Sequence, residues 1–163
     1  MNTYKKALLA LTILTAMGGA VSSARANELA GVKVAKAVFD ITTGDQKVFL
    51  DRMDLIRQTA DGLRKKGIKP DFVLVIHGPA AKFATKTLVG TKFENEKLDD
   101  LTKAQSSLDS LKNSGAKIEL CSIAMDRGHI AKDNVAPFAV IEDNVWENTI
   151  VLENKGYAYM PIH

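Results

Sequence analysis

Short apolar runs alternate with segments of helical period along residues 34–162, and this alternation constrains the fold more than any other feature. Residues 72–76 form a continuous apolar run between Pro70-Asp71 and Gly78-Pro79. Such a run is typical of a strand buried on both faces, as in parallel sheets. Four other runs are predicted to be strands, at residues 34–41, 118–121, 137–141 and 157–162. Pro161 has no amide hydrogen, so the last strand is expected at an edge.

The segments between these runs have the period of amphipathic helices. The first has its apolar residues at spacings of four and three, and Asp45 is its predicted N-cap: Phe49, Met53, Ile56, Ala60 and Leu63. The second stripe closes at Gly115: Leu98, Leu101, Ala104, Leu108 and Leu111. Shorter helices are expected at 80–85 and 122–127, and a last helix at 145–154. Strands alternating with helices predict an α/β fold with a five-stranded, mainly parallel sheet covered on both faces.

The carboxyl ends of the strands are where ligands bind in such sheets. The candidate surface therefore consists of the segments that directly follow a strand, at residues 42–45, 77–79 and 121–126.

The first 26 residues have the three parts of a signal peptide. Lys5 and Lys6 form a basic start, residues 7–20 are apolar, and Ala24-Arg25-Ala26 predicts cleavage after Ala26. A membrane anchor is the alternative, but it needs roughly 20 apolar residues. We therefore expect residues 1–26 to be removed and residues 27–163 to form one exported, periplasmic domain.

Cleavage changes the charge of the chain. It removes Lys5, Lys6 and Arg25 and no acidic residue, so the 22 basic and 19 acidic residues of the whole chain become 19 of each. A balanced chain gives no electrostatic reason to expect nucleic acid or an anionic membrane as a partner, since both attract clustered basic residues.

Cys121 is the main candidate for a chemically reactive residue. It is the only cysteine, so an intramolecular disulfide is impossible. It ends a predicted strand and starts a predicted helix, whose positive end favours a thiolate, the form that attacks sulfur. The alternative is a small buried apolar residue, a common state of free cysteine.

Other candidates surround the strand ends. His77 is a possible base or ligand-orienting group beside Cys121, provided that both their strands neighbour the first strand. Thr43 and Gly44 join the first strand to a helix N-terminus, where amides bind anions or simply make a capped turn. Arg127 could attract an anionic sulfur species or be a solvated surface residue. Gly78, directly after His77, is the last candidate. The histidines, His129 and His163 included, are scattered and do not have the spacing of a metal site, and no cofactor is expected.

The chain resembles the DsrE/DsrF-like family, and more narrowly its exported members. Four segments carry the resemblance: Phe39-Asp-Ile-Thr-Thr-Gly-Asp45, Lys69-Pro-Asp-Phe-Val-Leu-Val75, Ile118-Glu-Leu-Cys-Ser-Ile-Ala-Met125 and Asn154-Lys-Gly-Tyr-Ala-Tyr-Met-Pro-Ile162. The resemblance implies a Rossmann-like sheet, homo-oligomers that are often trimers or hexamers, and a link to sulfur metabolism. It also implies that Cys121 accepts sulfur as a persulfide and passes it on.

Two functions follow from these expectations. The first is a periplasmic sulfur relay, in which Cys121 exchanges sulfur with small sulfur species or with an acceptor protein. The second is a homo-oligomeric binding or scaffold module without covalent chemistry, in which Cys121 is structural. The well-studied relatives are cytoplasmic, so their partner proteins do not carry over to an exported chain.

Overall fold

The computed structural model describes residues 31–163; the predicted signal peptide, residues 1–26, lies outside that range. Residues 33–163 form one compact unit. Its sheet consists of five strands: β1 (Val34–Ile41), β2 (Lys69–Ile76), β3 (Lys117–Cys121), β4 (Val140–Glu142) and β5 (Ala158–Ile162). Every pairing is parallel, in the order β4-β3-β2-β1-β5. The predicted α/β fold is therefore confirmed, and β5 with Pro161 lies at an edge as expected.

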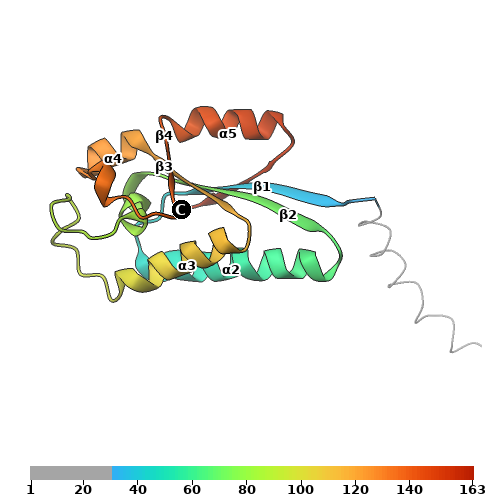
Figure 1. Cartoon of the computed structure of the whole chain (residues 1–163), viewed down its shortest axis with the longest axis horizontal. Coiled ribbons are helices and arrows are strands. Elements are labelled where there is room, and N and C mark those ends of the chain that lie inside the picture. Colours follow the sequence, from blue (N-terminus) through green and yellow to red (C-terminus); the bar gives the residue numbers. More distant parts are fainter. Residues whose placement is uncertain (1–30) are drawn as a thin grey trace, which may run out of the picture. The chain divides into compact units, whose positions relative to one another are not determined.

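Helices connect the strands (Figure 1): α2 (Gln46–Lys65), α3 (Leu101–Asn113), α4 (Ser122–Gly128) and α5 (Val145–Asn154), with 3₁₀ helices η1 (Gly78–Ala84) and η2 (Lys132–Asn134). Asp45 is the N-cap of α2, as predicted, and its side chain accepts a hydrogen bond of 2.8 Å from the amide of Val48. Among residues 31–163, none of the helices has the length and apolar character needed to cross a membrane.

Helices lie on both faces of the sheet (Figure 1). The chain steps from β1 to β4 in one direction, and then returns across the whole sheet to place β5 beside β1. Because crossovers between parallel strands are right-handed, the return places α5 on the face opposite to α2 and α3.

The two faces of the sheet differ in polarity. Side chains alternate along a strand, and paired residues of a parallel ladder point to the same face. The face under α2 and α3 is apolar and buried, and it includes Phe39, Ile41, Leu74, Ile76 and Leu120. The face under α5 includes polar residues near the carboxyl ends, namely Asp40, His77, Glu119 and Cys121. Functional groups therefore collect on the face that carries only one long helix.

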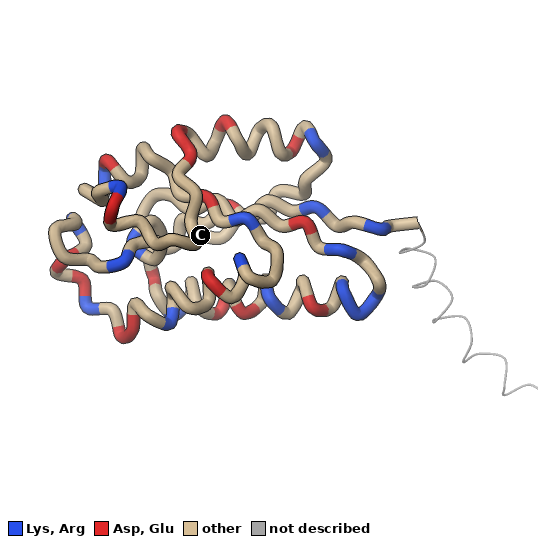
Figure 2. Tube along the Cα trace, in the orientation of Figure 1, with Lys and Arg blue, Asp and Glu red and all other residues tan. Residues whose placement is uncertain are grey.

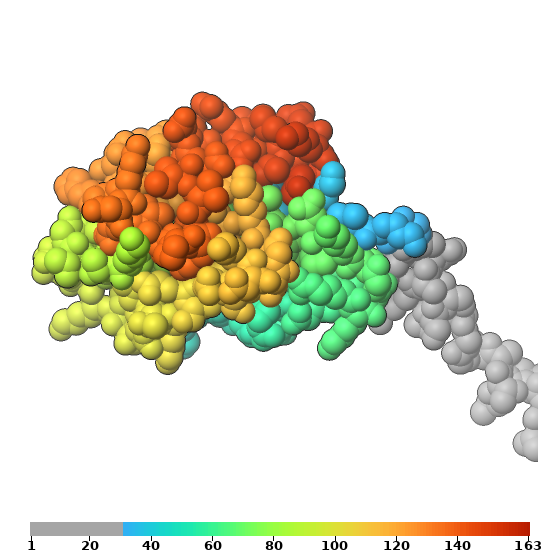
Figure 3. Space-filling model, in the orientation of Figure 1, coloured from blue at the N-terminus to red at the C-terminus, as the bar shows by residue number. Residues whose placement is uncertain are grey.

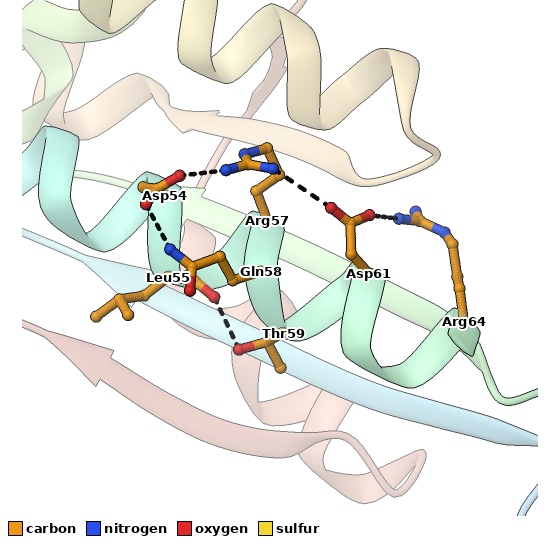
Figure 4. A network of polar contacts seen from close by, with 7 residues as sticks. All are labelled: Asp54, Leu55, Arg57, Gln58, Thr59, Asp61 and Arg64. Atoms are coloured by element: carbon orange, nitrogen blue, oxygen red, sulfur yellow. Dashed lines mark hydrogen bonds and ion pairs between the residues drawn. The ribbon is translucent and has the colours of Figure 1, made fainter. Parts of the chain in front are cut away.

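The exposed face of α2 carries a network of ion pairs (Figure 4). Arg57 bonds to Asp54 and Asp61, and Arg64 bonds to Asp61, at the three- and four-residue spacings that bring helical side chains together. The hydrogen bonds that Asp54 accepts from Arg57 and Gln58 lower the pKa of Asp54 below its ordinary value. Elsewhere, basic and acidic residues are interspersed along the chain (Figure 2). The network supports α2 and lies apart from the strand ends.

Some predicted boundaries are wrong for identifiable reasons. Leu98 lies before α3, because Asp100 caps that helix and accepts a bond of 3.2 Å from the amide of Lys103. The fourth strand begins at Val140 instead of residue 137, because the amide of Ala139 bonds back to Ala136 in a turn. The turns expected near residues 80–85 form the 3₁₀ helix η1.

Candidate functional site

Cys121 lies where β3 meets α4. It is the last residue of the strand and the N-cap of the helix, as the sequence predicts, and it has extended backbone angles. The residue is only 5% exposed, yet it lines a cavity of about 420 Å³ at the carboxyl end of the sheet. The volume is in the range of small-molecule sites. Its other lining residues are His77, Gly78, Pro79, Lys92, Ile123, Ala124, Arg127, Asn144, Val145 and Trp146.

His77 and Cys121 share this cavity through neighbouring strands. The expectation that the strands of both residues neighbour the first strand is wrong, because β3 pairs with β2 and β4 and is not adjacent to β1. The two residues line the same cavity because His77 directly follows β2 and Cys121 ends β3, and these two strands are paired. Gly78 continues the chain with φ of 56°, a conformation that strains residues with a side chain. This turn carries the chain away and leaves the His77 ring at the cavity wall.

Two cations face the cavity. Arg127 comes from α4, and Lys92 comes from the long connection between η1 and α3. A backbone hydrogen bond of 3.0 Å from the amide of Lys92 to the carbonyl of Gly128 joins the two segments. In Figure 3 the yellow-green connection lies beside the orange atoms of α4 at one end of the molecule. Among the described residues that line this cavity, none is Asp or Glu, so its field favours anions.

The connection that carries Lys92 is held in place by a buried lysine. Lys82 of η1 is 4% exposed and pairs with the carboxylate of Glu96. Its ammonium lies 5.3 Å from the ring centre of Phe83 and 5.6 Å from that of Phe93, within reach of cation–π attraction. Phe93 also packs against Gly128, where a Cβ atom would come within 3.1 Å of the ring. The position of Lys92 is thus set by packing on both sides of it.

Thr43 and Gly44, predicted as ligand-binding residues, lie elsewhere. Thr43 is buried, and a Cβ atom on Gly44 would come within 2.7 Å of Pro79 Cβ. The absence of a side chain at residue 44 lets the loop pack against η1, so Gly44 has a structural role in this loop. Among the lining residues of the Cys121 cavity described above, neither occurs, and their ligand role stays a prediction.

A buried carboxylate orients His77. Asp40 of β1 is 7% exposed and accepts hydrogen bonds of 2.5 Å from His77 Nε2 and 2.5 Å from the Tyr159 hydroxyl. Burial by itself would raise the pKa of Asp40, but the hydrogen bonds from His77 and Tyr159 lower it below its ordinary value. The hydrogen bond to Asp40, helped by burial, raises the pKa of Tyr159 to about 12. Asp40 is therefore ionised and Tyr159 neutral near pH 7.

Glu119 is a second buried carboxylate on the same face, two residues before Cys121. It is 1% exposed, and Asn148 of α5 donates a hydrogen bond to its Oε2. The Lys117 ammonium lies 2.7 Å from Oε1, and this contact raises the pKa of Lys117. Among the described residues no hydrogen bond of good geometry reaches Oε1, so the pairing there is ionic. These contacts tie β3 to α5 and fix the strand that ends in Cys121.

Several site residues escape sequence reasoning. Lys92 lies in a connection without periodicity, and nothing in the sequence places it beside Arg127. Asn144 caps α5 by accepting a bond of 3.1 Å from the amide of Trp146, and both residues line the cavity. Asp40 is the exception that the sequence does indicate, because it is a carboxylate within the apolar run of residues 37–41, and a buried carboxylate needs partners.

The remaining histidines are apart from the cavity. His129 is exposed and forms the left-handed C-cap of α4, and His163 Nδ1 lies 3.0 Å from the Thr42 hydroxyl. Residues 31–163 contain no group of three His, Cys, Asp or Glu side chains placed to hold a metal ion.

Comparison with known proteins shows the family of this chain. A protein of Aquifex aeolicus (strain VF5) described as uncharacterized is 37% identical over 127 residues, which are 77% of this chain and 55% of that protein, so the chain spans about half of its length. The solved structure of a protein of unknown function from Methanobacterium thermoautotrophicum is similar with a TM-score of 0.60 and 13% identity, covering 80% of this chain and 98% of that one. That likeness concerns the fold. The profile of the DsrE/DsrF-like family matches residues 5–161, and the chain belongs to that family.

Proposed function

We propose that this protein is a sulfur relay in which Cys121 carries sulfur as a persulfide. Family membership supports a sulfur-relay role in general. The observation that carries the finer proposal is the cavity of about 420 Å³, which is lined by Cys121 together with Lys92 and Arg127. Sulfur donors such as polysulfide are anions, and two cations beside a thiol attract them and hold them against the sulfur atom.

The proposal includes the place and the assembly of the protein. The signal peptide predicted for residues 1–26 directs it to the periplasm, and the mature chain forms a homo-oligomer, either a trimer or a hexamer. Exposed apolar side chains on α5 and the edge strand β5 are suited to a subunit contact: Trp146, Ile150, Tyr159 and Met160, with exposures of 64%, 59%, 42% and 45%. Aromatic residues are enriched in such interfaces.

A scaffold without covalent chemistry is the second candidate, favoured by one observation. Cys121 is 5% exposed and packs with the apolar core, as a structural cysteine would. Alkylation of the native protein separates the two functions. A thiol that reacts with iodoacetamide only after unfolding supports the scaffold, whereas native reaction supports the relay.

The relay proposal predicts that the protein gains sulfur at one residue. After treatment of the purified protein with sodium polysulfide, intact mass spectrometry should show the added mass of sulfur, because the Cys121 thiolate attacks a sulfane sulfur and releases the shorter polysulfide. Peptide mapping should place the addition on Cys121.

The matched control is Cys121→Ser, which keeps the size of the side chain and removes the nucleophile. It should gain no sulfur under the same conditions. A wild-type protein whose thiol remains unmodified while free cysteine in the same solution is converted would contradict the relay.

A further inference from the structure

We infer that His77, oriented by Asp40, is the group that takes the proton from Cys121 and returns it to the departing thiol during sulfur loading. This inference rests on the proposed function and names the proton carrier of the same site. It starts from a feature that burial alone does not explain, which is a histidine ring fixed by a carboxylate at the wall of the cysteine cavity.

The hydrogen bond to Asp40 determines the tautomer of His77. The Asp40 carboxylate is ionised and can only accept, so Nε2 of the ring carries the hydrogen in the bond of 2.5 Å. In the neutral ring the other nitrogen, Nδ1, then has a free lone pair and accepts a proton. Among residues 31–163, Nδ1 has no hydrogen-bond partner. The ring can therefore act as a base, because no described residue forms a hydrogen bond with its basic nitrogen.

The orientation of the ring is held from three strands and a helix. Asp40 on β1 is itself fixed by the Tyr159 hydroxyl of β5, at 2.5 Å. The Trp146 ring at the start of α5 meets the His77 ring edge-on, with 6.0 Å between the ring centres. His77 lines two hollows, the Cys121 cavity and a shallow groove toward β5. The charged or titratable groups that share these hollows are Cys121, Lys92, Arg127, Asp40, Tyr159, Glu153 and His163.

The proton step balances for a small organic persulfide, R–S–SH, as donor. Cys121 gives its proton to His77 Nδ1, and its sulfur attacks the outer sulfur of the donor. The donor S–S bond breaks, its electron pair stays on R–S⁻, and the imidazolium returns the proton to give R–SH. The products are the Cys121 persulfide and a free thiol. A carboxylate on R fits Lys92 and Arg127, and the cavity of about 420 Å³ has room for such a molecule.

The test compares loading rates from glutathione persulfide across a pH series, in the wild type and in His77→Asn. Near pH 7 the variant should load roughly a hundredfold more slowly, the size of a typical general-base contribution. At high pH hydroxide in solution removes thiol protons without a base on the protein, so the two rates should converge. The ratio of the two rates removes the ionisation of the donor, which is common to both proteins.

Two further variants keep the result interpretable. His129→Asn makes the same substitution at an exposed histidine outside the cavity, and it should match the wild type at every pH. Asp40→Asn keeps the size of the orienting residue and removes its charge, so it should also slow loading near pH 7; it provides the test if His77→Asn does not fold.

The outcomes separate the two proposals. Equal loading near pH 7 by wild type and a folded His77→Asn would overturn the role of His77 and leave the sulfur relay standing. A rate deficit that is the same at every pH would also overturn it, because a purely structural defect has that form. A wild type that never loads would contradict the relay and, with it, this inference.

Discussion

Replacing Phe49 with alanine is expected to lower the free energy of unfolding by about 3–5 kcal/mol, the cost of removing a large aromatic side chain from a packed core. Phe49 of α2 is 0% exposed, and its ring centre lies 4.2 Å from that of Phe83, which is also 0% exposed. Phe83 belongs to η1, directly after the turn that positions His77. The cavity left by the substitution would therefore weaken both the α2 side of the core and the support of the site.

Urea unfolding monitored by circular dichroism measures this effect. Leu55→Ala is the control on the same helix, because Leu55 is 45% exposed. Its effect should stay within about 0.5 kcal/mol, as expected for a surface position. Equal losses for the two variants would contradict the packing described for α2 and η1.

Reversing both cavity cations, in Lys92→Glu with Arg127→Glu, is expected to slow loading of Cys121 from polysulfide by roughly tenfold to a hundredfold. A single charge pair near a protein surface contributes roughly 1–4 kcal/mol, and each 1.4 kcal/mol corresponds to about a factor of ten. The reversal replaces attraction of an anionic donor with repulsion. The initial rate of sulfur gain, followed by mass spectrometry at low salt, gives the measurement.

The control for this double variant is Lys97→Glu with Lys132→Glu, which makes the same change in net charge at two exposed residues outside the cavity. Its loading rate should stay close to that of the wild type. The deficit of the cavity variant should shrink as salt is added, because ions screen exposed charges. A loading rate unaffected by the cavity substitutions would show that these cations do not bind the donor.

Most of the fold could be predicted because its signals are local. The continuous apolar run at residues 72–76 and the helical spacing from Phe49 to Leu63 depend only on neighbours in the chain. The boundaries that were wrong, at Leu98 and at residue 137, depend on which polar group closes a turn. That competition is decided by geometry that periodicity does not record.

The site could be predicted only in part. Cys121, His77, Gly78 and Arg127 were expected at strand ends or in the segments after them, and all four line one cavity. Lys92 could not be predicted, because a backbone bond to Gly128 brings it there from a connection without regular pattern. The bond between Asp40 and His77 joins residues 37 positions apart and follows from the pairing of β1 with β2. Strand order, which the sequence leaves open, is what assembles the site.

The most direct test of the central claim is release of the carried sulfur. Protein loaded with polysulfide and freed of excess reagent is treated with cyanide, which removes sulfane sulfur from a persulfide as thiocyanate. We predict that thiocyanate forms in proportion to the loaded Cys121 and that the protein returns to its unmodified mass with a free thiol. Loaded wild-type protein that yields no more thiocyanate than Cys121→Ser treated in the same way would contradict the account.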